Sequence, residues 1–339
     1  MVHHLARLLL LIVVLGQGAF ALASTSWFYG QLGNREVALR LTVDGNSGRV
    51  TYLETPQNAE SSGRHLTFDG DVTEDEDGSL RVQATTENGS HTIVLHVSVE
   101  PPTVDWSYLA EALRFAQTTL IEVGQESVAA EGVLSEIGTR IERRVALDDG
   151  SFEVTTSSPF FLAAPWSNLV LEPTGDDLAQ SVMAGLALQS DRDEMLNSTW
   201  WDDRFVEVTM LSNRLVSTRT HIYTYSGGAH PNTNYETHTW HLEADGWREL
   251  ELCEAIEVLE RPCNEALIRL YIMDELWEQA ALWAIDGSMS GDEPWVLEAF
   301  TLTPVGVLFR YAPYLAGPYV QGTFDVLLRW DDPLFLANP

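Results

Sequence analysis

The stretch REVALRLTVDGNSGRVTYLET, residues 35–55, decides how the first part of the chain folds. Its first half alternates apolar and polar residues, so Val37, Leu39 and Leu41 lie on one face of an extended strand. The sequence DGNSG then predicts a turn, and a second strand pattern follows it. The stretch therefore predicts a β-hairpin.

The same pattern continues to about residue 100. The segments RHLTFDGDV, SLRVQATT and HTIVLHVSV have strand composition, and the turn sequences EDEDG and ENGS separate them. We expect five or six short strands that form an antiparallel β-meander over residues 24–100. The acidic turn that starts at Thr73 has Ala84 where a calcium loop needs a bidentate glutamate, so it predicts a hairpin turn.

The rest of the chain mixes both kinds of secondary structure. EPPTVDW, residues 100–106, marks a domain boundary because prolines interrupt a strand ladder. Residues 108–130 fit a helix or a strand equally well, and a helix is expected after Gly175, where Asp176 can cap it. Strand patterns follow at residues 204–212, 214–226 and 232–246, and helical patterns follow at residues 250–260 and 263–285.

The predicted fold class is therefore α+β, with an N-terminal antiparallel β-meander followed by a mixed sheet packed with two or three helices. The predicted domains are residues 24–100 and 101–335. The long helix at 263–285 is expected to bury one face, formed by Leu267, Leu270, Ile272, Met273, Leu276 and Ala280. A hairpin around Thr303 and Gly306 and a closing strand in GTFDVLLRW complete the prediction.

The first 23 residues have the features of a cleaved secretory signal. The apolar segment LLLLIVVL, residues 8–15, is too short to span a bilayer, and Ala21 and Ala23 suit a signal peptidase. No later apolar run approaches the length of a membrane span. We expect an extracytoplasmic protein, periplasmic or secreted, without a membrane span after cleavage.

The chain of 339 residues is strongly acidic, with a formal net charge of −31, and every one of its 19 basic residues is arginine. Nucleic-acid binding is disfavoured, because contacts with phosphates need clustered positive charge. An acidic surface suits a cationic partner, although it also serves solubility alone.

The two cysteines, Cys253 and Cys263, are expected to form a disulfide in an exported protein. A metal site is the alternative, but it would need two further ligands that no recognisable spacing supplies. We expect no metal and no cofactor.

The segment YTYSGGAHPN, residues 223–232, joins two predicted strands and contains the first group of candidate binding residues. They are Tyr223, Tyr225, Gly227, Gly228, His230 and Asn232. The segment is a hairpin turn, a recognition loop that offers backbone amides and aromatic side chains, or a catalytic site.

Two forms of chemistry are disfavoured in this segment. His238 and His241 lie three residues apart on a strand and point to opposite faces, which opposes a shared metal ion with His221 and His230. A nucleophile at Ser226 lacks the G-x-S-x-G elbow.

The second candidate group lies in FRYAPYLAGPYVQG, residues 309–322. Tyr311, Tyr314 and Tyr319 alternate there with prolines and glycines. Tyrosines combine apolar area with a polar tip and suit sugar or protein surfaces. The alternative is a kinked connection that tucks the rings into the core.

These two motifs resemble those of the extracytoplasmic domain of unknown function found in the anti-sigma-V factor and in a peptidoglycan deacetylase. The likeness rests on YTYSGGAHP and on the later FRYAPYLAGPY, and it covers about residues 110–335. Residues 25–100 lie outside it, and WFYGQLGNREVALRLTVDG is loosely similar to a calycin-type β-meander.

The resemblance implies binding and not chemistry. In the anti-sigma factor the domain binds lysozyme, and in the deacetylase it accompanies a separate catalytic domain. We therefore expect a non-catalytic envelope protein that binds a lysozyme-like cationic protein or a cell-wall glycan such as a peptidoglycan fragment. The alternative is a cell-envelope hydrolase that uses His230 with nearby carboxylates.

Overall fold

The computed structural model describes residues 24–56, 58, 61–76, 78–99, 114–122, 130–146, 152–169, 171, 200–225 and 230–335. The secretory signal predicted for residues 1–23 and the helix predicted after Gly175 lie outside these ranges. None of the helices within them has the length and apolar character that crossing a bilayer requires.

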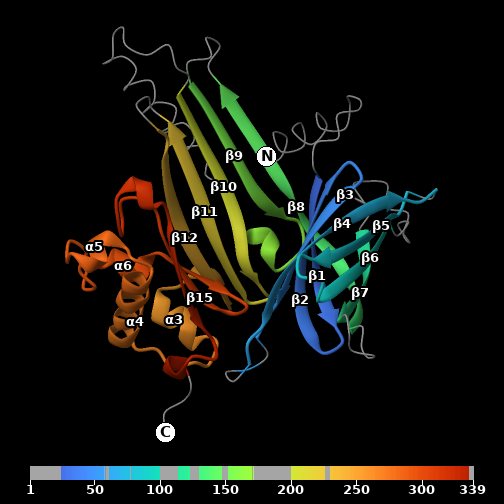
Figure 1. The fold of residues 1–339 in the computed structure, drawn as a ribbon. Helices are drawn as coiled ribbons and strands as arrows, with labels where there is room; N and C mark the ends of the chain where they lie inside the picture. Colours follow the sequence, from blue (N-terminus) through green and yellow to red (C-terminus); the bar gives the residue numbers. More distant parts are fainter. Residues whose placement is uncertain are drawn as a thin grey trace.

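The first eight strands form a closed antiparallel sheet (Figure 1). They are β1 (Ser24–Leu32), β2 (Arg35–Asp44), β3 (Ser47–Glu54), β4 (Arg64–Glu74), β5 (Leu80–Thr86), β6 (His91–Val99), β7 (Arg114–Glu122) and β8 (Ala130–Ala146). Each strand pairs with the next, and β1 also pairs with β8. Closure in this way satisfies the backbone groups that an edge strand would leave unpaired.

The inside of the closed sheet is an apolar core formed by alternate residues of each strand. Val37, Leu39 and Leu41 are buried in it, as the alternation predicts. Phe28 and Phe68 from neighbouring strands are fully buried in the same cluster. The polar residues between them point outward, so the outer face carries the side chains that can meet other parts of the molecule.

Two-residue turns set the register of the first hairpins. Gly33 and Asn34 join β1 to β2, and Gly45 and Asn46 join β2 to β3. Both glycines have positive φ, 61° and 58°, which a hairpin turn of this length requires and a side chain resists. The DGNSG turn is thus confirmed in position and in kind.

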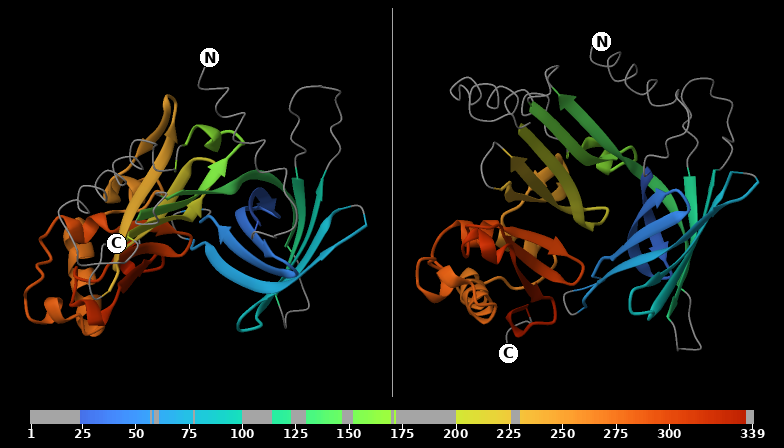
Figure 2. Two further views of the ribbon diagram at one scale, coloured as in Figure 1. Left: turned by 90° about the horizontal axis from the view of Figure 1, so that it is seen from above. Right: turned by 45° about the horizontal axis from the view of Figure 1, so that its top comes forward.

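The sheet continues beyond the closed part because β8 is long enough to belong to two layers. Its first half pairs with β7 and β1, and its second half pairs with β9. The open part then adds β9 (Phe152–Phe161), β10 (Trp200–Leu211), β11 (Leu215–Tyr225), β12 (Asn232–Glu243) and β13 (Gly246–Glu249). Figure 2 shows this open sheet extending away from the closed one. The pair β9–β10 is parallel, and the later pairs are antiparallel.

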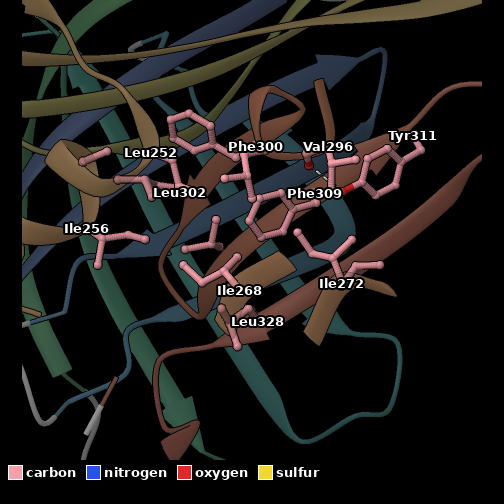
Figure 3. Close-up of a cluster of buried hydrophobic side chains, with 14 of the residues drawn as sticks. Leu252, Ile256, Ile268, Ile272, Val296, Phe300, Leu302, Phe309, Tyr311 and Leu328 are labelled. Atoms are coloured by element: carbon pink, nitrogen blue, oxygen red, sulfur yellow. Dashed lines mark hydrogen bonds between the residues drawn. The ribbon is translucent and has the colours of Figure 1, made fainter. Parts of the chain in front are cut away.

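The C-terminal part packs helices against a separate three-stranded sheet. The elements are α3 (Leu252–Glu257), α4 (Glu265–Glu278), α5 (Leu282–Ile285), α6 (Trp295–Glu298), β14 (Phe300–Thr303), β15 (Gly306–Tyr311) and β16 (Phe324–Arg329). Three short 3-10 turns accompany the described elements: Trp166–Asn168, Tyr319–Gln321 and Pro333–Phe335. Figure 3 shows the buried core of this part, where Ile268 and Ile272 of α4 face Phe309 and Leu328.

The C-terminal part covers one face of the open sheet at one end. Strand β14 contacts β10, β11 and β12. The backbone N–H of Leu302 donates to Ser217 Oγ at 2.9 Å, and Thr237 Oγ1 donates to the carbonyl of Glu298 at 2.8 Å. Ser217 and Thr237 lie on the same face of their strands as Arg219, His221 and Tyr223. The rest of that face is therefore available to form a site.

The predicted α+β class is wrong, because the chain is mainly β. Thirteen strands join in one sheet, and the described helices all lie between Leu252 and Glu298. The segment that fitted a helix or a strand contains strand β7, and β8 and β9 follow it. Strands β7, β8 and β9 pair in sequence order, and β8 also pairs with the distant β1, which local periodicity does not reveal. The predicted boundary near residue 100 remains a prediction.

The long helix predicted at 263–285 is also shorter and rotated. It ends at Glu278, and Ala280 has φ of 58°, which breaks the helix before α5. Ile268, Ile272 and Leu276 form its buried face, whereas Leu267 and Leu270 are exposed.

The predicted disulfide is confirmed. Cys253 in α3 and Cys263 are joined with a Cα–Cα distance of 5.4 Å. The bond ties α3 to the segment just before α4, where Asn264 Oδ1 accepts the N–H of Leu267.

Candidate functional site

The first candidate motif connects β11 and β12, which pair antiparallel as predicted. Gly227 and Gly228 fall in residues 226–229, outside the described part of the chain. Tyr223 and Tyr225 end β11, and the description resumes at His230. Asn232 is exposed at the start of β12, where it pairs with Thr224.

His230 lies against the second candidate motif. Its ring stacks on Tyr319 with centroids 3.7 Å apart and an angle of 15° between the planes. Tyr314 is next to both rings, at 6.5 Å from His230 and 5.8 Å from Tyr319. The structure thus brings together three residues that are up to 89 positions apart in sequence, here named the His230 cluster: His230, Tyr314 and Tyr319.

Hydrogen bonds fix the orientation of the His230 ring. Its Nδ1 donates to the carbonyl of Pro231 at 2.9 Å, so Nδ1 carries a proton and Nε2 is the acceptor in the neutral ring. The Tyr314 hydroxyl lies 3.5 Å from Nε2, at the outer limit of a hydrogen bond. Among the described residues, His230 contacts the rings of Tyr314 and Tyr319, the Tyr314 hydroxyl and the Pro231 carbonyl. None of these groups is a carboxylate.

Tyr314 is held in an unusual conformation. Its φ is 71°, in the left-handed region that non-glycine residues seldom adopt, and its side chain is 50% exposed. The backbone N–H of Tyr314 donates to the carbonyl of Gly317 at 3.0 Å, which closes the turn around it. Such conformations gather at binding sites, where the fold pays for presenting a side chain.

Tyr311, in contrast, is part of the core. It is fully buried, and its hydroxyl donates to the carbonyl of Val296 at 2.7 Å (Figure 3). Burial raises the pKa of this phenol above its ordinary value. Tyr311 therefore supports the C-terminal sheet and does not reach the candidate surface.

The other tyrosines of the first motif belong to a row of rings on the face of the open sheet. This row, named the aromatic stripe, contains Trp201, His221, Tyr223, Tyr225 and Tyr235. Trp201 lies 4.7 Å from Tyr223 and 5.9 Å from Tyr225, and His221 stacks on Tyr235 at 5.1 Å. All five side chains are half-buried, so each is partly exposed to solvent.

Trp201 and Tyr235 were not predicted as site residues. Trp201 is opposite Tyr225 in the register of β10 and β11, and Tyr235 is opposite His221 in that of β11 and β12. The pairing of Tyr235 could have been inferred from the hairpin alone, since the two strands are adjacent in sequence. The pairing of Trp201 depends on the register of β10, which local sequence does not give.

Arginines border the stripe where the C-terminal part begins. Arg310 forms an ion pair with Asp325, and its guanidinium lies 5.4 Å from the Tyr235 ring centroid. Arg219 forms an ion pair with Glu207 and lies 5.9 Å from the same ring. Both distances suit a cation–π contact, so Tyr235 is held between two cations.

The histidines do not converge on one point. His238 Nδ1 lies 2.5 Å from a carboxylate oxygen of Glu249, while His241 lies three positions further along β12. Across the described ranges, no group of three or more histidine, cysteine, aspartate or glutamate side chains could hold a metal ion.

The sequence matches no family model and no curated protein. Solved structures that align with it include a DUF3298 family member from Bacteroides fragilis and a DUF3298 family protein from Pseudomonas aeruginosa. Each shares 14% sequence identity at a TM-score of 0.35. The alignments cover 57% of this chain and 89% of the first structure, and 59% of this chain and 96% of the second.

Both neighbours come from a family of unknown function, which is consistent with the expected domain of unknown function. The likeness is too low to carry an argument about activity. It shows no link to the anti-sigma-V factor or to the peptidoglycan deacetylase.

Proposed function

We propose that the chain is an exported, non-catalytic protein of the cell envelope that binds a cell-wall glycan through its aromatic stripe. The observation that carries the proposal is the row of five half-buried rings from three neighbouring strands, β10, β11 and β12. Rings fixed on a sheet offer flat apolar faces beside polar tips, which suits the alternating apolar and hydroxylated faces of sugars.

The rigidity of the stripe supports binding. Neighbouring rings restrain one another, and the strands that carry them are paired on both sides. Binding to such a surface orders few side chains, so little of the contact energy is lost to entropy.

The environment of His230 favours a positioning role over hydrolysis. A histidine base must face the group whose proton it takes and is usually oriented by a carboxylate. His230 instead stacks on Tyr319 and donates to its neighbour's carbonyl. In this proposal the His230 cluster holds the exposed Tyr314 ring near the start of β12, as a second contact for the ligand.

A cationic, lysozyme-like protein is the second candidate partner. The net charge of −31 favours it, because opposite charge speeds encounter and adds attraction at low salt. This candidate needs no particular residue of the stripe, and that difference separates the two proposals.

Calorimetric titration of the purified protein with soluble peptidoglycan fragments and, separately, with lysozyme tests the proposal. Trp201→Ala and Tyr223→Ala should each weaken binding of the fragments about tenfold, the equivalent of about 1.4 kcal/mol. Trp277→Ala is the matched control, since Trp277 is an exposed tryptophan on α4, away from the stripe. Lysozyme binding that is lost in high salt but unchanged in Trp201→Ala, with no binding of fragments, would favour the second candidate.

A further inference from the structure

Arginines gather where the outer face of the closed sheet approaches the open sheet. Strand β3 of the closed sheet contacts β10 of the open one. Six charged or titratable side chains from five strands share this region, here named the arginine site: Arg40, His65, Arg140, Glu207, Arg219 and His221.

The strands place these side chains from both sides. Arg40 alternates with the buried Leu39 and Leu41, so it points away from the inside of the closed sheet, where its Nη2 donates to Thr51 Oγ1 at 3.0 Å. On the open sheet, Glu207 pairs in register with Arg219.

Arg140 connects the two sides because it lies on β8, the strand that both sheets share. Its Nε donates to Ser157 Oγ, and its guanidinium lies 3.7 Å from the centre of the Phe205 ring. Phe205 pairs in register with His221 and alternates with Glu207, so these three side chains share one face.

Buried nitrogen atoms without partners collect in this region. In the described part of the chain, the buried side-chain atoms that make no hydrogen bond are Arg140 Nη2, Arg219 Nη1, His221 Nε2 and Arg261 Nε. The first three belong to the arginine site, and Arg219 is only 8% exposed. An unpaired buried donor destabilises the folded state, more so when it is charged, so three such atoms on neighbouring side chains indicate a missing acceptor.

The charges at the arginine site are consistent with a missing acceptor. Burial and then the charge of Arg40 lower the pKa of Arg140 to about 10, although Glu142 and Glu207 act in the opposite direction. Burial also lowers the pKa of Arg40, whose nearest opposing charge is again Glu207. One carboxylate, Glu207, thus interacts electrostatically with guanidinium groups on both sheets. The arginines of the site outnumber it, so positive charge remains in excess.

Solvent reaches the site in spite of this crowding. Phe205 is 41% exposed. The His65 side chain is exposed as well, yet its pKa is lowered, mainly because surrounding protein displaces water. Glu207 acts in the opposite direction, and Arg40 and Arg219 repel a proton.

We propose that the arginine site binds an oxyanion, the carboxylate or phosphate group of a small molecule, through Arg140, Arg219 and His221. Guanidinium groups match both kinds of oxyanion with paired N–H donors. The oxyanion accepts from Arg140 Nη2 and Arg219 Nη1, and the protonated Nε2 of His221 adds a third donor. This site adjoins the proposed glycan contact and shares His221 with it, and its ligand is recognised by charge.

Thermal unfolding with added inorganic phosphate or citrate, against chloride at the same ionic strength, tests the proposal. The midpoint temperature of unfolding should rise by about 2–4 °C with phosphate or citrate, or with both, and not with chloride. If only phosphate raises the midpoint, the ligand carries a phosphate group. If only citrate raises it, the ligand carries a carboxylate. Equal effects of phosphate, citrate and chloride would overturn the proposal.

Variants locate the effect. Arg140→Gln and Arg219→Gln should abolish the rise, whereas Arg329→Gln, an exposed arginine outside the site, should keep it. If Arg219→Gln does not fold, Arg140→Gln decides, because Arg140 lies nearer to solvent. Glu207→Gln should enlarge the rise, because it removes the anion that competes with the ligand. An unchanged rise in Arg140→Gln would contradict the assignment.

Discussion

At the residue scale, similar side chains in one motif have different tasks. Tyr311 and Tyr314 lie three positions apart, yet one is fully buried and hydrogen-bonded and the other is half exposed at positive φ. The sequence predicts that tyrosines gather in this segment, but not which of them is buried. That depends on β15, where alternate residues face the helices, and on the turn that follows it.

Tyr311→Phe should lower the free energy of unfolding by about 1–2 kcal/mol, because the buried carbonyl of Val296 loses its donor. Tyr314→Phe is the matched control, and we expect a change within about 0.5 kcal/mol. Urea unfolding of both variants measures the difference. Equal stability of Tyr311→Phe and the parent protein would show that the carbonyl finds another donor.

At the element scale, strands were easier to predict than helices. The strands of the first hundred residues follow period-two alternation and lie where it places them, with turns at Gly33 and Gly45. The buried face of α4 was predicted only in part: Ile272 and Leu276 are buried as expected, but Leu267 and Leu270 are apolar and exposed. Apolar residues on the surface are common, and they make the buried face of a short helix difficult to identify from the sequence pattern.

The end of α4 offers a direct test of helix termination. Ala280 follows the helix with φ of 58°, a conformation that glycine adopts without steric cost. Ala280→Gly should therefore raise the free energy of unfolding by about 0.5–1 kcal/mol. Ala281→Gly, at a buried neighbour with negative φ, should lower it. Denaturant unfolding measures the free energy of unfolding of both variants. A decrease in Ala280→Gly would contradict the assigned backbone conformation.

At the scale of the whole molecule, long-range pairing decides the architecture. The closed sheet depends on β1 meeting β8, more than 100 residues later, and the open sheet depends on β8 belonging to both layers. The pairing of β1 with β8 has no local signal in the sequence, and local patterns do not show that one sheet continues through thirteen strands, so the α+β prediction failed. The candidate tyrosines were predictable from two motifs, but Trp201 and the arginine site came from strands that only the complete sheet brings together.

The same architecture gives two adjoining surfaces with different chemistry. The aromatic stripe lies on β10–β12, and the arginine site lies where this sheet approaches the closed one. His221 belongs to both, and Arg219 of the arginine site contacts Tyr235 of the stripe, so a glycan and a small anion would bind at neighbouring positions.

Hydrogen exchange of the backbone amides with and without saturating peptidoglycan fragments tests the central claim most directly. Binding at the stripe should slow exchange in β10, in β11 and at the start of β12, and it should leave β4, β5 and β6 of the closed sheet unchanged. The protection should disappear in Trp201→Ala at the same fragment concentration. Protection confined to the closed sheet, or none in β10 and β11 while the fragments bind, would contradict the account.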